Sequence, residues 1–398
     1  MMKQNLSLMR SFPARAGKQV ELENMQSGPY NRWAFPNMRR LLPTANVWRG
    51  NGPVYELPAA PLGLAHLEFA GKSGETLRIG DVACGEFTDG LVVLNRGAVV
   101  WERYDDGIEA HEPHLLMSVS KSIAGSLTGI LVERGLLSPS DRITDIIAEV
   151  KNSAYEDATL RNLLDMTVGM EYDEDYDNPL SDIGLLDAAS GWRPAREGMP
   201  DNLRDYICTM RKGPPHGESF HYVSTNTDLL GWILERASGL DFATLLSREI
   251  WQPMGAETDA YVTLDRLGAP QADGGICVTT RDLARFGQLH LQEGCIDGRR
   301  IIPARWIRDF QENGDAETWN RGNFAADLPG YHYRSKWYTD LTDPHRAYKG
   351  IGIHGQVLFV DPVTHTVIAH HASHPAPLDH DYFENLFLAF KAISRELV

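Results

Sequence analysis

The chain has 398 residues, of which 42% are hydrophobic, and its formal net charge is -16. That length allows one large domain or two closely joined domains around a sizeable core. Because so acidic a surface repels a phosphate backbone, we do not expect nucleic acid as a partner.

Cysteine usage and hydropathy narrow the class of protein further. The four cysteines lie far apart and form no C-x-x-C pair, which favours reduced thiols in a cytoplasmic protein over a disulfide framework or a zinc site. The first ten residues hold no long apolar run and no small-residue cleavage site, so we expect no signal peptide. No apolar run is long enough to predict a transmembrane helix or a membrane partner.

The first hundred residues predict an arm followed by a hairpin. Residues 1–60 mix Pro, Gly, Asn and Arg with scattered aromatic residues, which indicates an arm packed on the body of the protein. Two β-rich runs, 91–94 and 98–104, then flank Asn95-Arg96-Gly97. Such runs around an Asn/Gly turn predict a β-hairpin.

A serine and a lysine, Ser118 and Lys121, stand three residues apart where an apolar helix is predicted to begin, a helix that closes near Gly135. On a helix these positions share a face, so Lys121 Nζ can contact Ser118 Oγ. Burial and the positive end of the helix dipole both favour the neutral amine, which can take the serine proton. An S-x-x-K pair also arises by chance, but a lysine at the start of an apolar helix is costly without a role. We therefore predict an activated nucleophile for acyl transfer.

Helical patterns dominate the middle of the chain. They include 159–166 and a helix near Asp228 to Ser238 that ends at Gly239. Between them, residues 172–179 are acidic, aromatic and rich in turn formers, and composition alone favours a solvated loop. Strand patterns return only near residue 357.

Tyr222-Val223-Ser224 lies just before that second helix, where side chains can face a cleft. A serine–lysine pair still needs a proton donor for the leaving group. A lone tyrosine at a helix start more often serves packing, but a phenol beside a lysine can share its proton. Because S-x-x-K lies upstream, we favour a function for Tyr222.

The glycine-rich stretch 349–356 precedes a predicted strand over 357–360. Its glycines match G-x-G-x-x-G, but the dinucleotide fingerprint must leave a strand and open a helix, so the match is misleading. Glycines at a strand edge let a substrate lie against backbone N–H groups, which suits an oxyanion hole. His354, within this stretch, is more simply a structural or substrate-lining residue than a base or a ligand.

Two histidine-containing segments do not make convincing metal sites. His111-Glu112-Pro113-His114 lacks the H-E-x-x-H spacing, and Pro113 opposes a helix that would carry both imidazoles. The run 370–374 has no evident paired carboxylate. We therefore expect no metal and no cofactor.

The chain ends with strands over 357–360 and 366–369 and an amphipathic helix whose apolar side includes Phe383, Leu386, Phe387, Phe390 and Ile393. With the early hairpin, these elements predict an α+β fold. An antiparallel sheet built from both ends of the chain is covered by helices, with a mainly helical insertion in the middle.

The order of S-x-x-K, Y-x-S and the glycine-rich stretch resembles the serine β-lactamase and penicillin-recognising family, especially its class C and esterase-like branch. Within that family the chain is similar to the nylon-oligomer amidases, which cleave 6-aminohexanoate dimers. The stretches that carry this similarity are 31–35, 115–122, 226–228, 281–285 and 350–356. The resemblance covers nearly the whole chain.

This resemblance implies a β-lactamase-like fold. An arm over 1–60 would pack on an α/β domain formed by 61–172 and 273–398. A mainly helical domain would cover 173–272, and the active site would lie between the two domains.

The resemblance also implies a catalytic set. Ser118 would be the nucleophile, Lys121 its base and Tyr222 the proton shuttle to the leaving amine. The N–H groups of Ser118 and Ile353 would hold the oxyanion.

Further residues match substrate contacts of the amidases. Tyr176 matches a tyrosine that closes over the substrate, so residues 172–177 become a candidate lid rather than a plain loop. Asp187 matches an aspartate that receives the free ammonium of the substrate, and Trp337 matches a tryptophan that lines the pocket. His354 is included as a substrate-lining candidate.

Departures from the amidase pattern leave the preferred substrate open. Asp273 stands where the amidases have asparagine or histidine before Gly-Gly, and Leu378 stands where one form has aspartate; both positions lie in the substrate pocket. The β-lactam enzymes carry K-T-G at the strand, and no such lysine follows Gly350. Efficient β-lactam hydrolysis is therefore less expected.

We thus expect a cytoplasmic serine hydrolase that cleaves a small linear amide or ester through an acyl-enzyme, with an amino-bearing substrate end attracted by Asp187. A carboxylesterase with weak amidase or β-lactamase activity is the second hypothesis. A non-catalytic binding protein on the same fold is the third. The sequence leaves the oligomeric state open, a homodimer included.

Overall fold

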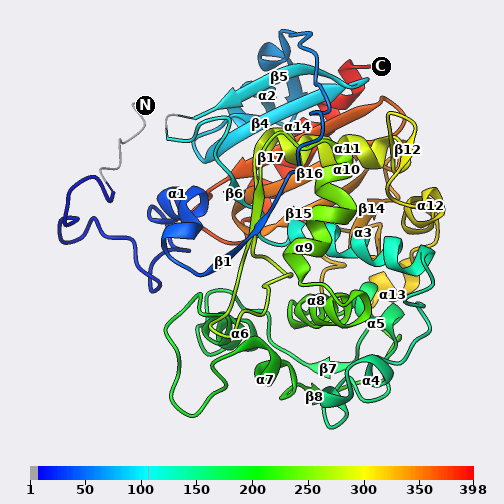
Figure 1. Ribbon diagram of the computed structural model, residues 1–398. Coiled ribbons are helices and arrows are strands. Elements are labelled where there is room, and N and C mark those ends of the chain that lie inside the picture. The colour runs from blue at the N-terminus through cyan, green and yellow to red at the C-terminus, as the bar shows by residue number, and fades with distance from the viewer. Residues whose placement is uncertain (1–7, 106) are drawn as a thin grey trace.

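The computed structural model describes residues 8–105 and 107–398. Within them, a seven-stranded antiparallel sheet has the order β13-β14-β15-β16-β17-β4-β5 (Figure 1). Its strands are β4 (Thr88–Asn95), β5 (Ala98–Tyr104), β13 (Tyr331–Arg334), β14 (Trp337–Asp340), β15 (Tyr348–Gly352), β16 (Gln356–Asp361) and β17 (Thr366–Ala372). Early and late strands meet where Val93 of β4 pairs with Ile368 of β17. The predicted sheet from both ends of the chain is therefore confirmed.

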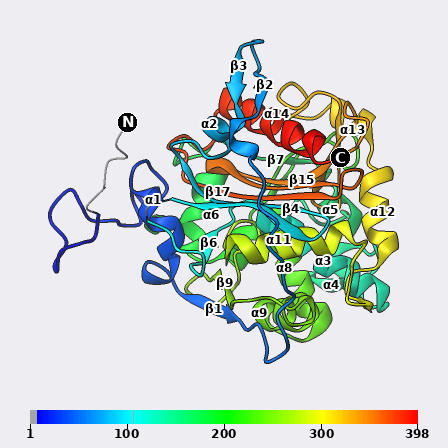
Figure 2. The ribbon, with the colours of Figure 1, turned by 90° about the horizontal axis from the view of Figure 1, so that it is seen from above.

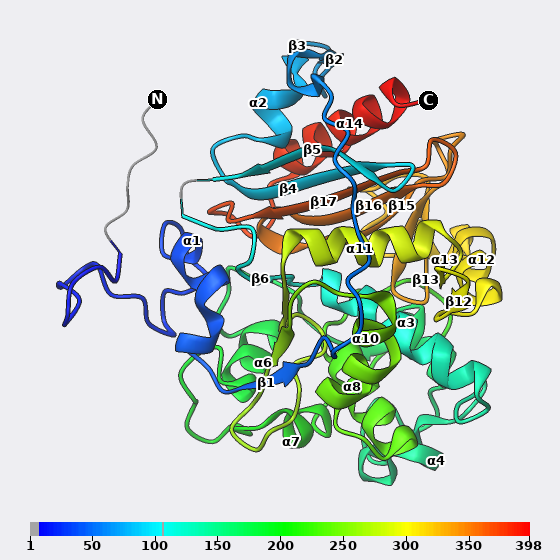
Figure 3. The ribbon, with the colours of Figure 1, turned by 45° about the horizontal axis from the view of Figure 1, so that its top comes forward.

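Helices cover both faces of this sheet because side chains alternate along each strand. Phe359 packs in one core with α14 (His380–Glu396) and α2 (Ile79–Ala83). Leu358, its neighbour, packs in the other core with α11 (Thr280–Leu291). Figure 3 shows α2 and α14 above the strands and α11 below them.

The predicted hairpin joins β4 to β5. Arg96 and Gly97 both have positive φ, 51° and 82°, and Asn95 pairs with Ala98 across the turn. Two consecutive left-handed residues match the twist of the strands that they connect. The late strands and the amphipathic C-terminal helix are confirmed as well.

The helical part of the molecule lies below the sheet in Figure 1. Helix α8 packs on α3 and α5 and ends at Gly239 in the left-handed conformation, as its sequence predicts. The helices outside the sheet layers are α1 (Asn31–Ala34), α3 (Val119–Glu133), α4 (Ile143–Ile146), α5 (Leu160–Leu164), α6 (Asp182–Ser190), α7 (Leu203–Ile207), α8 (Thr225–Ser238), α9 (Phe242–Leu246), α10 (Gln252–Met254), α12 (Ala304–Glu312) and α13 (Ala316–Asn320).

A second sheet has the order β1-β9-β10-β6 and includes strands from the middle of the sequence. Its strands are β1 (Thr44–Val47), β6 (His114–Leu115), β9 (Ala260–Thr263) and β10 (Ile276–Val278). The prediction that strands return only near residue 357 is therefore wrong. Strands β9 and β10 are short and wholly buried, so they lack the alternation that reveals a half-buried strand.

Short two-stranded pairs complete the described structure. They are β2 (Glu68–Ala70) with β3 (Thr76–Arg78), β7 (Met170–Glu171) with β8 (Arg211–Lys212), and β11 (Cys295–Ile296) with β12 (Arg299–Arg300). None of the helices over residues 8–105 and 107–398 has the length and apolar character that a bilayer crossing requires.

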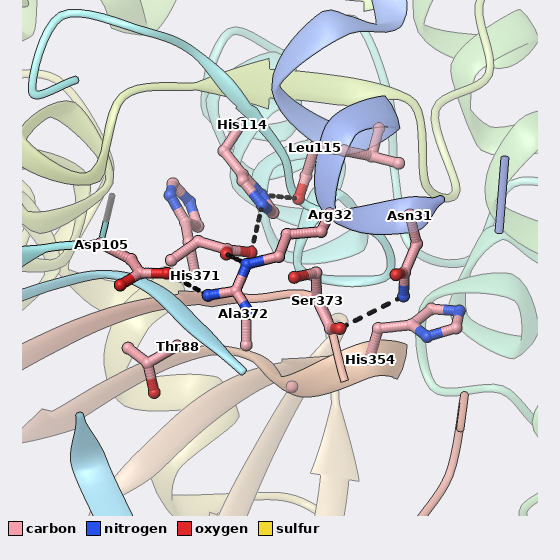
Figure 4. Close-up of polar contacts among 12 residues, drawn as sticks. Asn31, Arg32, Thr88, Asp105, His114, Leu115, His354, His371, Ala372 and Ser373 are labelled. Atoms are coloured by element: carbon pink, nitrogen blue, oxygen red, sulfur yellow. Dashed lines mark hydrogen bonds and ion pairs between the residues drawn. The ribbon is translucent and has the colours of Figure 1, made fainter. Parts of the chain in front are cut away.

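The described part of the arm projects from one side of the body before it docks through α1 (Figure 2). Asn31 Nδ2 donates to the backbone oxygen of Ser373 at 3.3 Å, and the Arg32 guanidinium is paired with Asp105. Figure 4 shows these contacts around the end of β17. They fix the arm beside the strands that border the candidate site.

Candidate active site

Ser118 occupies the N-cap position of α3, at the start of a helix that is buried from Val119 to Leu131. Its neighbour Met117 has a φ of 47°, a conformation that costs energy for a residue with a side chain. Ser118 itself is half-buried. The bend before α3 therefore presents the hydroxyl at the surface of a rigid, buried helix.

Lys121 is only 1% exposed, and its Nζ lies 2.8 Å from Ser118 Oγ, 3.1 Å from Ser224 Oγ and 2.9 Å from the backbone oxygen of Asp273. A neutral amine can donate its two hydrogens to Ser224 and Asp273 and accept the proton of Ser118. The contact between Lys121 and Ser118 is the one that the i, i+3 spacing predicts.

Tyr222 joins this pair from the segment before α8. Its hydroxyl lies close to Ser118 and Tyr338, and its ring centroid lies 5.1 Å from Lys121 Nζ. Phe324 stacks on the other side of the ring, with 4.9 Å between centroids. Burial raises the pKa of Tyr222 well above its ordinary value, so the phenol keeps its proton at neutral pH. Ser118, Lys121 and Tyr222 thus converge.

Strand β15 lies against the backbone of the nucleophile. A Cβ on Gly352 would lie 2.7 Å from the oxygen of Leu116 and 2.9 Å from the nitrogen of Ser118, so only glycine fits. Ile353, the proposed second oxyanion donor, follows directly. The glycine-rich stretch was expected only to precede a strand, but it contains a strand of its own, because glycine weakens the strand signal.

Glu174 is part of the site although the sequence analysis missed it. Ser224 Oγ donates to Glu174 Oε1 at 2.5 Å, Ser224 N donates to Oε2 at 3.0 Å, and the hydroxyl of Tyr176 donates to Oε1 at 2.9 Å. Burial raises the pKa of Glu174 to about 7, against the opposing effect of the Lys121 charge. The only signal was its place between two aromatic residues of the acidic segment. That segment therefore lies over the site.

Comparison with known proteins identifies the family. The pattern of the family described as Beta-lactamase matches residues 82–391, more than half of the chain. The chain belongs to the beta-lactamase family. This is a family of hydrolases, and the expected β-lactamase-like α+β fold is confirmed.

Relatives narrow the position within the beta-lactamase family. The chain is 35% identical to the 6-aminohexanoate-dimer hydrolase of Paenarthrobacter ureafaciens over 371 residues, 92% of this chain and 91% of that one. A structure from Bacillus anthracis, named as a candidate 6-aminohexanoate-dimer hydrolase, has a TM-score of 0.87 and 27% identity and covers 95% of this chain and 97% of that chain. A family VIII carboxylesterase shares the fold, with a TM-score of 0.58 and 16% identity over 78% of this chain and 94% of that chain.

Asp187 of this beta-lactamase-family chain already has partners inside the protein. Asp187 lies in α6, and its Oδ2 accepts a hydrogen bond from Arg193 Nε at 3.1 Å. The same oxygen accepts a second hydrogen bond from Gln26 Nε2, on the arm, at 2.9 Å. Burial raises the pKa of Asp187, and the charge of Arg193 opposes that rise. No pattern in the sequence predicts either partner.

Trp337, expected to line the pocket, does not do so. Its side chain is fully buried and packs on Phe310 and His290, with centroid distances of 5.2 and 4.7 Å. Successive residues of a strand face opposite sides, so it is Tyr338 that lies beside Tyr222. Trp337 therefore faces the core, and Tyr338 faces the phenol.

His354 is held by structural contacts. Its Nδ1 is hydrogen-bonded to the backbone oxygen of His374 at 2.7 Å, and its ring meets Phe35 edge-on at 5.3 Å. Burial lowers its pKa to about 4, so the imidazole is neutral. Figure 4 places His354 beside Asn31 and Ser373. The sequence left open whether His354 is a structural or a substrate-lining residue, and these contacts favour a structural role.

Two further histidines, His114 and His371, pack in the same region. His114 Nε2 is hydrogen-bonded to Asp89 at 3.2 Å, and its ring stacks on His371 at 4.7 Å between centroids. Over the described residues, no three side chains of His, Cys, Asp or Glu are arranged to hold a metal ion.

A cavity of about 450 Å³ lies behind Tyr222, between β14, β15 and α14. Phe324 and Tyr338, both in contact with Tyr222, form part of its wall. Ile351 and Leu378 line it as well. Its volume is in the range of small-molecule sites.

Proposed function

We propose that this chain is a serine hydrolase that cleaves small linear amides of the 6-aminohexanoate-dimer type through an acyl-enzyme intermediate. The observation that supports this most is the convergence of Ser118, Lys121 and Tyr222, in which Lys121 Nζ lies 2.8 Å from Ser118 Oγ and 5.1 Å from the centroid of the Tyr222 ring. The identity to a 6-aminohexanoate-dimer hydrolase supports the substrate class.

In acylation, the amine of Lys121 takes the proton of Ser118 while Oγ forms a bond to the substrate carbonyl carbon. The N–H groups of Ser118 and Ile353 stabilise the oxyanion. Tyr222 then donates its proton to the leaving nitrogen as the C–N bond breaks, and the proton held by Lys121 restores the phenol. The products are an ester on Ser118 and a free amine.

Deacylation runs the transfers in reverse. Water attacks the ester carbonyl, gives its proton to the phenol–amine pair, and Ser118 Oγ leaves with a proton from that pair. The leaving amine of the first step must lie on the Tyr222 side of the carbonyl. The cavity of about 450 Å³ behind Phe324 and Tyr338 is where we place the chain attached to that amine.

A fluorophosphonate probe tests the nucleophile. We expect labelling of the wild-type protein at Ser118, no labelling of Ser118→Ala, and a loss of about 10⁴-fold or more in hydrolysis of 6-aminohexanoate dimer. Ser140→Ala, at an exposed serine on a turn, is the control and should label normally. Failure of the wild type to label would favour the non-catalytic binding protein.

A carboxylesterase is the second candidate, and the Arg193–Asp187 contact favours it. Because Asp187 already accepts from a cationic side chain at 3.1 Å, a substrate ammonium is not needed to balance its charge. The comparison to make is between 6-aminohexanoate dimer, its N-acetylated form and a short-chain nitrophenyl ester. A kcat/KM at least as high on the two uncharged substrates would favour the esterase.

Tyr222→Phe separates amide from ester cleavage. An amine is a poor leaving group without a proton, whereas nitrophenolate leaves unaided, so we expect a loss of about 100-fold or more on the amide and a much smaller loss on the ester. Steady-state kinetics on both substrates with one enzyme preparation measure the ratio. Equal losses would contradict the proposed role of Tyr222.

A further inference from the structure

Two buried carboxyl groups lie side by side behind Lys121. Asp228, in the first turn of α8, is 3% exposed, and Asp273 is 5% exposed. Asp273 N donates to Asp228 Oδ1 at 3.1 Å, and the two side-chain carboxyl groups are within hydrogen-bond reach of each other. Asp273 Oδ2 lies 3.6 Å from Lys121 Nζ. The sequence analysis gave no role to Asp228.

One oxygen on each of the two carboxyl groups lacks a hydrogen-bond partner unless a proton lies between the groups. Asp228 Oδ2 and Asp273 Oδ1 are both buried and have no partner among the described residues. Two unpartnered anionic oxygens in contact would be costly, whereas one shared proton satisfies both. Burial and the charge of Asp273 raise the pKa of Asp228 well above its ordinary value, in agreement with that count.

We propose that Asp228 is a positioning residue that shares one proton with Asp273 and so keeps a single negative charge beside Lys121. The inference rests on the proposed role of Lys121 as the base for Ser118. A second negative charge would hold Lys121 as an ammonium, which cannot take the serine proton. Loss of the Asp228 side chain would free the segment whose backbone oxygen orients the amine at 2.9 Å.

Other titratable groups surround the pair. The charge of Asp228 contributes to the pKa shifts of Tyr155 and Lys336. Lys336 Nζ donates a hydrogen bond to the backbone oxygen of Leu163 at 2.6 Å. Glu174 is connected to Lys121 through Ser224. Burial raises the pKa of Glu174 to about 7, so an experiment must separate Glu174 from Asp228.

The test compares Asp228→Asn with Asp228→Leu by the pH dependence of kcat/KM on p-nitrophenyl acetate. Asparagine has the size of the protonated acid and can donate to Asp273, so we expect activity within about threefold of wild type at neutral pH. Its activity should persist to higher pH than that of the wild type, since no second negative charge can form. Leucine cannot form the hydrogen bond, and we expect a loss of about 100-fold at every pH.

Controls separate this inference from the proposed function. Glu174→Gln should shift the acid limb of the profile and leave the alkaline limb unchanged. Infrared spectra of the folded wild type should show a protonated-carboxyl C=O band at neutral pH that Asp228→Asn lacks. Absence of that band, superimposable wild-type and asparagine profiles, or an asparagine variant as impaired as the leucine variant would each overturn the inference while fluorophosphonate labelling of Ser118 persists. A wild type that does not label would overturn both.

Discussion

Glu174 shows how one side chain can make this site sensitive to pH. Its two oxygens accept from Ser224 and Tyr176, and Ser224 Oγ in turn accepts from Lys121 Nζ. An ionised Glu174 draws the Ser224 hydrogen toward itself and leaves the serine oxygen free to accept from the lysine. Because its pKa is raised to about 7, this orientation weakens as the pH falls below neutral.

The raised pKa also has a consequence for stability. A carboxyl whose pKa rises from 4.5 to about 7 on folding binds more protons in the folded state, so its contribution to stability falls as the pH rises through that window. Relative to wild type, we therefore expect Glu174→Gln to gain stability between pH 5 and pH 8. Thermal unfolding at both pH values measures the difference. The exposed Glu86→Gln should show no such trend, and an equal trend in both variants would contradict the assignment.

The elements that meet at the site come from separate parts of the chain. Helix α3 carries Ser118 and Lys121, the segment before α8 carries Tyr222, and β15 brings its glycines against the nucleophile. One close approach between these elements is at Gly352, where a Cβ would lie 2.9 Å from Ser118 N. The position of β15 relative to α3 thus depends on the absence of one methyl group.

Gly352→Ala should separate activity from stability. The added methyl would meet backbone atoms of Leu116 and Ser118, which cannot rotate away, so β15 must shift from the nucleophile. We expect kcat/KM to fall by about 100-fold, with a modest fall in melting temperature. Gly63→Ala, whose Cβ would meet nothing within 4 Å, is the matched control. An alanine variant with wild-type kcat/KM would rule out the close contact.

At the scale of the whole molecule, the sheet is stabilised by two separate cores. The core under α14 contains Phe390, which is fully buried and lies 6.0 Å from Phe359 between ring centroids. This core is on the opposite side of the sheet from α11 and does not include Ser118. Damage to it should lower stability with little direct effect on the chemistry.

Phe390→Ala tests this separation. Truncation of a fully buried phenylalanine leaves a cavity and should cost about 3–5 kcal/mol in the free energy of unfolding. Urea denaturation measures the cost, and kcat measured well below the melting temperature should stay close to wild type. The exposed Val363→Ala should change stability by less than about 0.5 kcal/mol. A large change in kcat for Phe390→Ala would show that the two cores are coupled.

What could be predicted from the sequence was mainly local. The contact between Ser118 and Lys121 follows from helical geometry, and the β4–β5 hairpin follows from its turn residues. By contrast, Gln26 beside Asp187 and Glu174 beside Ser224 depend on how distant segments pack, and no period or spacing reveals them. Trp337 shows a third case, because a match by similarity does not fix which face of its strand a side chain occupies.

The pairing of β4 with β17 also sets the order of events during synthesis. Ser118 and Lys121 leave the ribosome early, but β15, which precedes the proposed oxyanion donor Ile353, and β17, which joins β4 in the sheet, are made much later. Until then the hairpin has an unpaired edge, and the serine has no partner strand. We therefore expect the nascent chain to be inactive until almost all of it has emerged. Chaperones that shield exposed strand edges would act during that interval.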